Sequence, residues 1–68
     1  MYLKRLKDLR EDADISQDKL AKILHISQRA YSHYEKGDRE IPFDVLIKLA
    51  DFYNVSLDYI AERTNKRR

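Results

Sequence analysis

Two serines, Ser16 and Ser27, each follow an isoleucine and lie eleven positions apart. An apolar residue stands four positions after each serine, Leu20 in the first case and Tyr31 in the second. This pattern is typical of a serine that caps a helix and of a preceding apolar residue that packs against the first turn. Eleven residues hold a helix of about two turns and a tight connection, which is the spacing of a helix-turn-helix. The pattern predicts such a motif at about residues 17–36.

The rest of the chain carries further helix signals. Residues 2 to about 12 place three leucines on one stripe, and the cap pattern recurs at Ser56. Pro42 fits the first turn of another helix, which Asn54 ends. One glycine and one proline leave little material for hairpin turns. The sequence therefore predicts an all-α fold of five helices.

Two residues stand where helices of the motif end. Gly37 is predicted to take the left-handed conformation that closes many helices. His25 stands where the chain turns between the two helices, a position that often needs positive φ. Glycine adopts positive φ without strain and histidine does not, so we expect backbone strain at His25.

Length and charge bound the domain organisation. A chain of 68 residues has room for one compact core, and we place a single domain at residues 1–62. Residues 63–68 hold four of the fourteen basic side chains and none of the twelve acidic ones. This tail has nothing apolar to bury and is expected to be disordered. The net charge of +2 is therefore weak evidence about partners, and the positions of the bases matter more.

The sequence lacks the residues that several functional classes need. The chain has no cysteine, no apolar run long enough for a membrane span and no signal-peptide pattern, so we expect a cytoplasmic protein. The acidic residues Glu11, Asp12 and Asp14 have no histidine partner nearby, and His25 has no nucleophile beside it. We therefore expect no metal, no cofactor, no small-molecule substrate and no enzymatic activity.

The second helix of the motif, residues 28–36, has one apolar and one polar face. The apolar face carries Ala30, Tyr31 and Tyr34. The opposite face consists of side chains that can donate hydrogen bonds, none of them acidic: Gln28, Arg29, Ser32, His33 and Lys36. Glutamine and arginine match adenine and guanine edges in the major groove of DNA, and both lie in the first turn. The alternative interpretation is a polar face that only contacts water.

Residues 3–60 resemble the phage-repressor type of helix-turn-helix domain, related to Cro and lambda repressor, also called the xenobiotic-response-element family. The resemblance rests on a set of short matches: Ser16-Gln17, Leu20-Ala21, Ile26-Ser27, Tyr34-Glu35-Lys36-Gly37, Pro42, Leu49-Ala50 and Val55-Ser56-Leu57. The sequence departs from the family at His25, where glycine is usual, and at Tyr31, where a smaller aliphatic residue is usual. The resemblance implies a compact lambda-repressor-like fold of five helices.

The resemblance also implies roles for individual residues. The residues expected to read DNA bases are Gln28, Arg29, Ser32 and His33. The residues expected to bind backbone phosphates are Gln17, Ser27, Lys36 and Arg39. The implied function is sequence-specific binding of double-stranded DNA by a transcriptional regulator, a repressor, with residues 28–36 in the major groove.

Two further expectations concern partners. The resemblance implies a homodimer on a two-fold operator, and we expect the two copies to meet through the last helix, among Leu57, Tyr59 and Ile60. The rival interpretation is an antitoxin or adaptor-like module that binds protein and has weak or no specific DNA binding.

Overall fold

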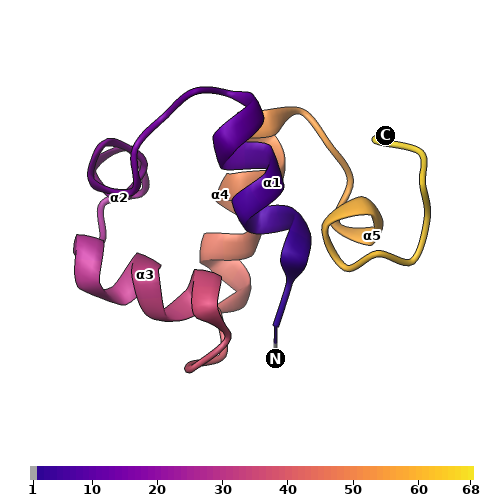
Figure 1. The fold of residues 1–68 in the computed structure, drawn as a ribbon. Helices are drawn as coiled ribbons and strands as arrows, with labels where there is room; N and C mark the ends of the chain where they lie inside the picture. Colours follow the sequence, from indigo (N-terminus) through magenta and orange to yellow (C-terminus); the bar gives the residue numbers. More distant parts are fainter. Residues whose placement is uncertain (1) are drawn as a thin grey trace.

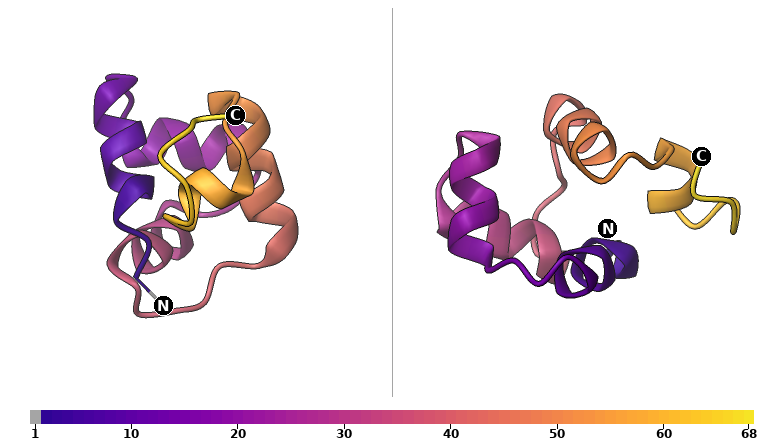
Figure 2. Two further views of the ribbon diagram at one scale, coloured as in Figure 1. Left: turned by 90° about the vertical axis from the view of Figure 1, so that its right-hand side faces the viewer. Right: turned by 90° about the horizontal axis from the view of Figure 1, so that it is seen from above.

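The structure, a computed structural model, describes residues 2–68, and this part of the chain forms five α-helices and no strand (Figure 1). The helices are α1 (Lys4–Asp12), α2 (Gln17–Leu24), α3 (Gln28–Lys36), α4 (Phe43–Tyr53) and α5 (Leu57–Ile60). Helices α1 and α4 lie between the α2–α3 pair on one side and α5 on the other, as Figure 1 and the right-hand view of Figure 2 show. The predicted all-α fold with its helix-turn-helix is confirmed. None of these helices is long and apolar enough to cross a membrane.

The three serines predicted to cap helices all do so. The Oγ atoms of Ser16, Ser27 and Ser56 each accept a hydrogen bond from the backbone N–H three residues later, at 3.0 to 3.1 Å. Each bond satisfies one of the amide groups that a helix start leaves without a partner. The cap at Ser27 therefore determines where α3 starts.

The predicted helix ends also agree with the structure, with one correction. His25, Gly37 and Asn54 have φ angles of 60°, 84° and 57° and all lie in the left-handed region. The placement of Pro42 in the first turn of α4 is wrong, because its ψ of 145° is extended and Phe43 is the first helical residue. Pro42 is instead the residue that precedes the helix.

Replacing His25 by glycine is expected to leave the stability unchanged or to raise it by up to about 1 kcal/mol, since glycine reaches positive φ without strain. The side chain of His25 is exposed and so has little packing to lose. Chemical denaturation of the two proteins measures the difference. The control is Lys22→Gly in the last turn of α2, which should cost about 1 kcal/mol. A clear loss of stability in the His25 variant would contradict the strain argument.

One hydrophobic core joins all five helices. Its buried members are Leu3, Leu6, Leu9, Leu20, Ala21, Leu24, Tyr31, Val45, Leu49, Ala50, Val55 and Ile60. Tyr31 is fully buried, as its helical position predicted, while Ala30 and Tyr34 are only half-buried. Ile60 is also fully buried, so it is not available for an interface between subunits.

Residues 61–68 run back along α5 without forming a helix or strand (Figure 2). Arg5 in α1 donates hydrogen bonds to the carbonyl oxygens of Tyr59 and Thr64, both at 2.7 Å, and its guanidinium lies 4.1 Å from the centre of the Tyr59 ring. The backbone N–H of Ser56 donates to the carbonyl oxygen of Arg67. These contacts place the segment beside α1 and α5. The domain boundary at residue 62 and the disorder of the tail stay predictions.

Candidate nucleic-acid interface

Six of the eight residues predicted to contact DNA line one open hollow of about 470 Å³ on the surface of α2 and α3: Gln17, Gln28, Arg29, Ser32, His33 and Lys36. Five of them come from α3, where their spacing places them on one face of the helix. The sixth, Gln17, is the first residue of α2. The structure therefore brings the first turn of α2 to the outer face of α3.

The other two predicted residues lie outside this hollow, at opposite ends of α3. Ser27 is the residue before the helix; its Oγ accepts the N–H of Ala30, which leaves the hydroxyl hydrogen free to donate elsewhere. Arg39 is exposed in the loop that follows Gly37. Both positions can therefore be reached by a partner that lies along α3.

The lining of the hollow has a positive charge balance. Arg29 and Lys36 supply two cations, and none of the lining residues is acidic. Asp38 stands next to this surface, with its Oδ2 3.4 Å from Nδ1 of His33. The surface thus offers several donors and fixed positive charge to an anionic partner.

The opposite face of α3 carries a buried ion pair that the sequence did not predict. Glu35 is only 5% exposed and accepts two hydrogen bonds from Arg10 of α1, from Nε at 2.9 Å and from Nη2 at 3.0 Å. The available signal was that Glu35 lies four residues after Tyr31 and so shares its inward face. A carboxylate on that face needs a cation, but the identity of the cation does not follow from spacing.

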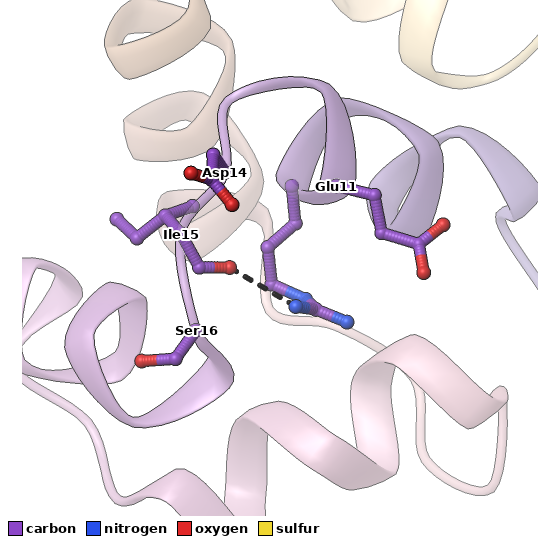
Figure 3. Close-up of a pocket in the computed structure, with 5 residues that line it drawn as sticks. Glu11, Asp14, Ile15 and Ser16 are labelled. Carbon is purple, nitrogen blue, oxygen red and sulfur yellow. Dashed lines mark hydrogen bonds between the residues drawn. The ribbon is translucent and has the colours of Figure 1, made fainter.

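Arg10 also holds the connection between α1 and α2. Its Nη1 donates to the carbonyl oxygen of Ile15 at 3.0 Å, the bond drawn as a dashed line in Figure 3. The surface hollow beside it is lined by Arg10, Glu11, Asp14, Ile15 and Ser16. The carboxylates of Glu11 and Asp14 lie apart there and do not point toward each other (Figure 3). Within residues 2–68 no three potential ligands gather into a metal site.

Gln17 links this buried pair to the hollow on α2 and α3. Its Nε2 donates to Oε1 of Glu35 at 3.2 Å, so the side chain is tied to the inner side of α3. One amide hydrogen and the amide oxygen of Gln17 remain for an outside partner. The position of Gln17 at the edge of the hollow therefore depends on Glu35 and, through it, on Arg10.

The ionisation of Glu35 reflects its surroundings. Burial alone would raise the pKa of this carboxyl, but the hydrogen bonds from Arg10 and Gln17 outweigh burial and hold the pKa below its ordinary value. The hydroxyl of Tyr31 also favours the charged carboxylate. Glu35 is therefore charged at neutral pH. Within residues 2–68 the Tyr31 hydroxyl has no hydrogen-bond partner. Burial also raises the pKa of the nearby Tyr53 hydroxyl, to about 12.

Comparison with known proteins gives a family match over most of the chain. Residues 6–60 match the family described as Helix-turn-helix. The HTH-type transcriptional regulator ImmR of Bacillus subtilis is 42% identical over 57 residues, which cover 84% of this chain and 45% of that protein. The uncharacterized HTH-type transcriptional regulator YobD of Bacillus subtilis is 37% identical over 65 residues, 96% of this chain and 58% of that protein.

A third relative is a phage protein. The cryptic phage CTXphi transcriptional repressor RstR of Vibrio cholerae is 32% identical over 57 residues, which cover 84% of this chain and 51% of that protein. The chain thus spans about half the length of the curated relatives it matches.

Proposed function

The chain belongs to the helix-turn-helix family, and on this premise we propose that it binds double-stranded DNA in a sequence-specific manner and regulates transcription, as a repressor. The family is one of DNA-binding regulators and not of enzymes. The observation that carries the proposal is the gathering of six donor-bearing residues in one hollow on α2 and α3. The relatives are named as transcriptional regulators and a repressor, which supports the same conclusion. The proposed location is the cytoplasm.

Base reading is assigned to the outer face of α3. Gln28 and Arg29 are exposed in its first turn, the end that enters the major groove in this type of domain. Glutamine pairs with N6 and N7 of adenine, and arginine pairs with O6 and N7 of guanine. Ser32 and His33 follow one turn later on the same face and reach neighbouring base pairs.

Phosphate binding is assigned to the two ends of the motif. Gln17 and Ser27 lie at the starts of α2 and α3, where free backbone amides favour an anion. Lys36 and Arg39 lie at the far end of α3 and contribute positive charge. Phosphate binding at both ends would fix the helix in the groove but carry no base preference of its own.

We further propose that two copies bind a two-fold operator. A single helix reads a short half-site, and two copies about 34 Å apart would place their α3 helices in successive major grooves. The proposed interface uses α5, where Leu57 and Tyr59 are partly exposed. Ile60 belongs to the core and is no longer part of this surface.

The proposal is tested by substitutions that separate base reading from phosphate binding. An operator is first selected from random duplexes. Arg29→Ala and Gln28→Ala should weaken operator binding by about 1 to 3 kcal/mol and relax the preference at one base pair of each half-site. Lys36→Ala and Arg39→Ala should weaken binding to all sequences and reduce the salt slope by about one for each phosphate that a subunit no longer neutralises.

The control is Lys48→Ala, which removes an exposed lysine of α4 outside the hollow and should change neither property. Equal losses on operator and random DNA for Arg29→Ala and Lys36→Ala would exclude direct base reading by α3. The rival function, a protein-binding antitoxin or adaptor-like module, predicts weak or no specific DNA binding and no steep loss of DNA affinity as salt is added.

A further inference from the structure

The loop after α3 folds back onto a residue of the proposed base-reading surface. Gly37 has a φ of 84°, and this left-handed residue lets the backbone N–H of Asp38 donate to the carbonyl oxygen of His33 at 3.0 Å. The same turn brings Oδ2 of Asp38 within 3.4 Å of Nδ1 of His33. The backbone bond therefore fixes the position from which the Asp38 side chain meets the imidazole ring.

A carboxylate at Nδ1 determines where the imidazole carries its proton. A neutral imidazole has one N–H, on either Nδ1 or Nε2, and an ionised carboxylate can only accept a hydrogen bond. A bond to Asp38 thus requires the proton on Nδ1 and leaves Nε2 as an acceptor. Without such a partner, an imidazole in water carries the proton mainly on Nε2, which would then be a donor.

We propose that Asp38 sets the tautomer of His33 and thereby determines which base His33 can hydrogen-bond in the major groove. The inference rests on the proposed function of the hollow, which His33 lines together with Gln28, Arg29 and Ser32. An acceptor at Nε2 favours bases with an amino group in the major groove, which are cytosine at N4 and adenine at N6. It disfavours guanine O6 and thymine O4, which are acceptors themselves.

No other acidic side chain near the His33 ring is placed to set its tautomer in the part of the chain described. The lining of the hollow around His33 includes two cations, Arg29 and Lys36, and the amide of Gln17 from α2, but no carboxylate. Glu35, on the inner face of the same helix, is engaged with Arg10 and Gln17. Within residues 2–68, the acidic side chain that contacts the ring is that of Asp38. Asp38 is therefore a positioning residue that acts on DNA through His33.

The first test needs no DNA. Nitrogen-15 NMR of the imidazole rings at pH 8, where imidazole side chains are ordinarily neutral, identifies which nitrogen of His33 carries the proton. We expect Nδ1–H in the natural protein and a shift to Nε2–H in Asp38→Ala. The matched control is Glu40→Ala, which removes an exposed charge from the same loop and should leave the tautomer unchanged. Nε2–H in the natural protein would overturn the inference, whatever the protein binds.

The second test measures base preference. In selection from random duplexes at pH 8, Asp38→Ala should reduce the preference for cytosine or adenine at one position of each half-site by about tenfold, the effect of removing one base-edge hydrogen bond. Glu40→Ala should select the same sequences as the natural protein. In a His33→Ala background, the Asp38 substitution should have no further effect at that position, because its action passes through the ring.

The outcomes separate this inference from the function it rests on. If Asp38→Ala and Glu40→Ala selected identical sequences while the natural protein showed a clear operator, the role of Asp38 would be excluded and the proposed function would stand. If the natural protein selected no sequence, the proposed function would fail and the base-reading role of Asp38 with it. The NMR result would then still report the tautomer.

Discussion

Replacing Glu35 by alanine is expected to destabilise the domain by about 3 to 5 kcal/mol, a large fraction of the stability of a small domain. The reason is that Arg10, only 14% exposed, would keep its charge in the protein interior without a partner. The hydrogen bond from Gln17 would be lost as well. Chemical denaturation measures the effect, and Glu11→Ala, an exposed carboxylate of α1, is the control that should change stability by less than about 0.5 kcal/mol.

A double variant distinguishes the lost charge partner from a simple cavity. Replacing Arg10 by methionine together with Glu35 by leucine removes both charges and keeps similar volume, and it should recover much of the lost stability. If Glu35→Ala were as stable as the natural protein, the pair would contribute nothing. If the double variant were no better than Glu35→Ala, the cost would come from packing.

The same carboxyl gives the stability a dependence on pH. The pKa of Glu35 is lower in the folded protein than its ordinary value of 4.5, so the folded state favours the charged form. Its contribution is fully present above about pH 4.5 and is lost as the pH falls through the folded-state pKa. Acid denaturation of Glu35→Gln, which cannot titrate at this position, should therefore show a shallower decline below that pH.

Replacing Leu20 or Leu49 by alanine is expected to cost roughly 2 to 5 kcal/mol, because each side chain is 0% exposed and its removal leaves a cavity. In a domain of 68 residues such a loss can unfold the protein. The thermal unfolding midpoint of each variant, or the absence of a cooperative transition, measures the effect.

Each core substitution has a matched control on the same helix. Ile23 in α2 and Ile47 in α4 are 41% and 39% exposed, so their replacement by alanine should cost clearly less than the leucine variants. Equal losses for Leu49→Ala and Ile47→Ala would mean that the core is not where the structure places it.

The features of the fold that the sequence predicted are those with local causes. A serine cap, a left-handed residue at a helix end and an apolar stripe each depend on residues within one or two turns. The bounds of α2 and α3 agree with the prediction for this reason. The prediction misplaces Pro42 by one position because its φ of −60° is a helical value, and only its ψ of 145° places it before the helix.

The features that the sequence did not predict depend on distant partners. Arg10 and Glu35 are 25 residues apart, and no local pattern says which cation meets a buried carboxylate. The burial of Ile60 depends on how α5 packs, which the helical period of a four-residue helix does not specify. Within the candidate site, five residues could be grouped because one helix carries them, whereas the approach of Asp38 to His33 required the geometry of the turn at Gly37.

Helix α3 divides its side chains between two separate tasks. Tyr31 and Glu35 point into the domain and hold the fold, while Gln28, Arg29, Ser32 and His33 lie on the outer side. Substitutions on the outer side therefore leave the core packing and the buried ion pair intact. Under the proposed function, exchanging those four side chains would therefore change the operator preference while the scaffold and its stability stay the same.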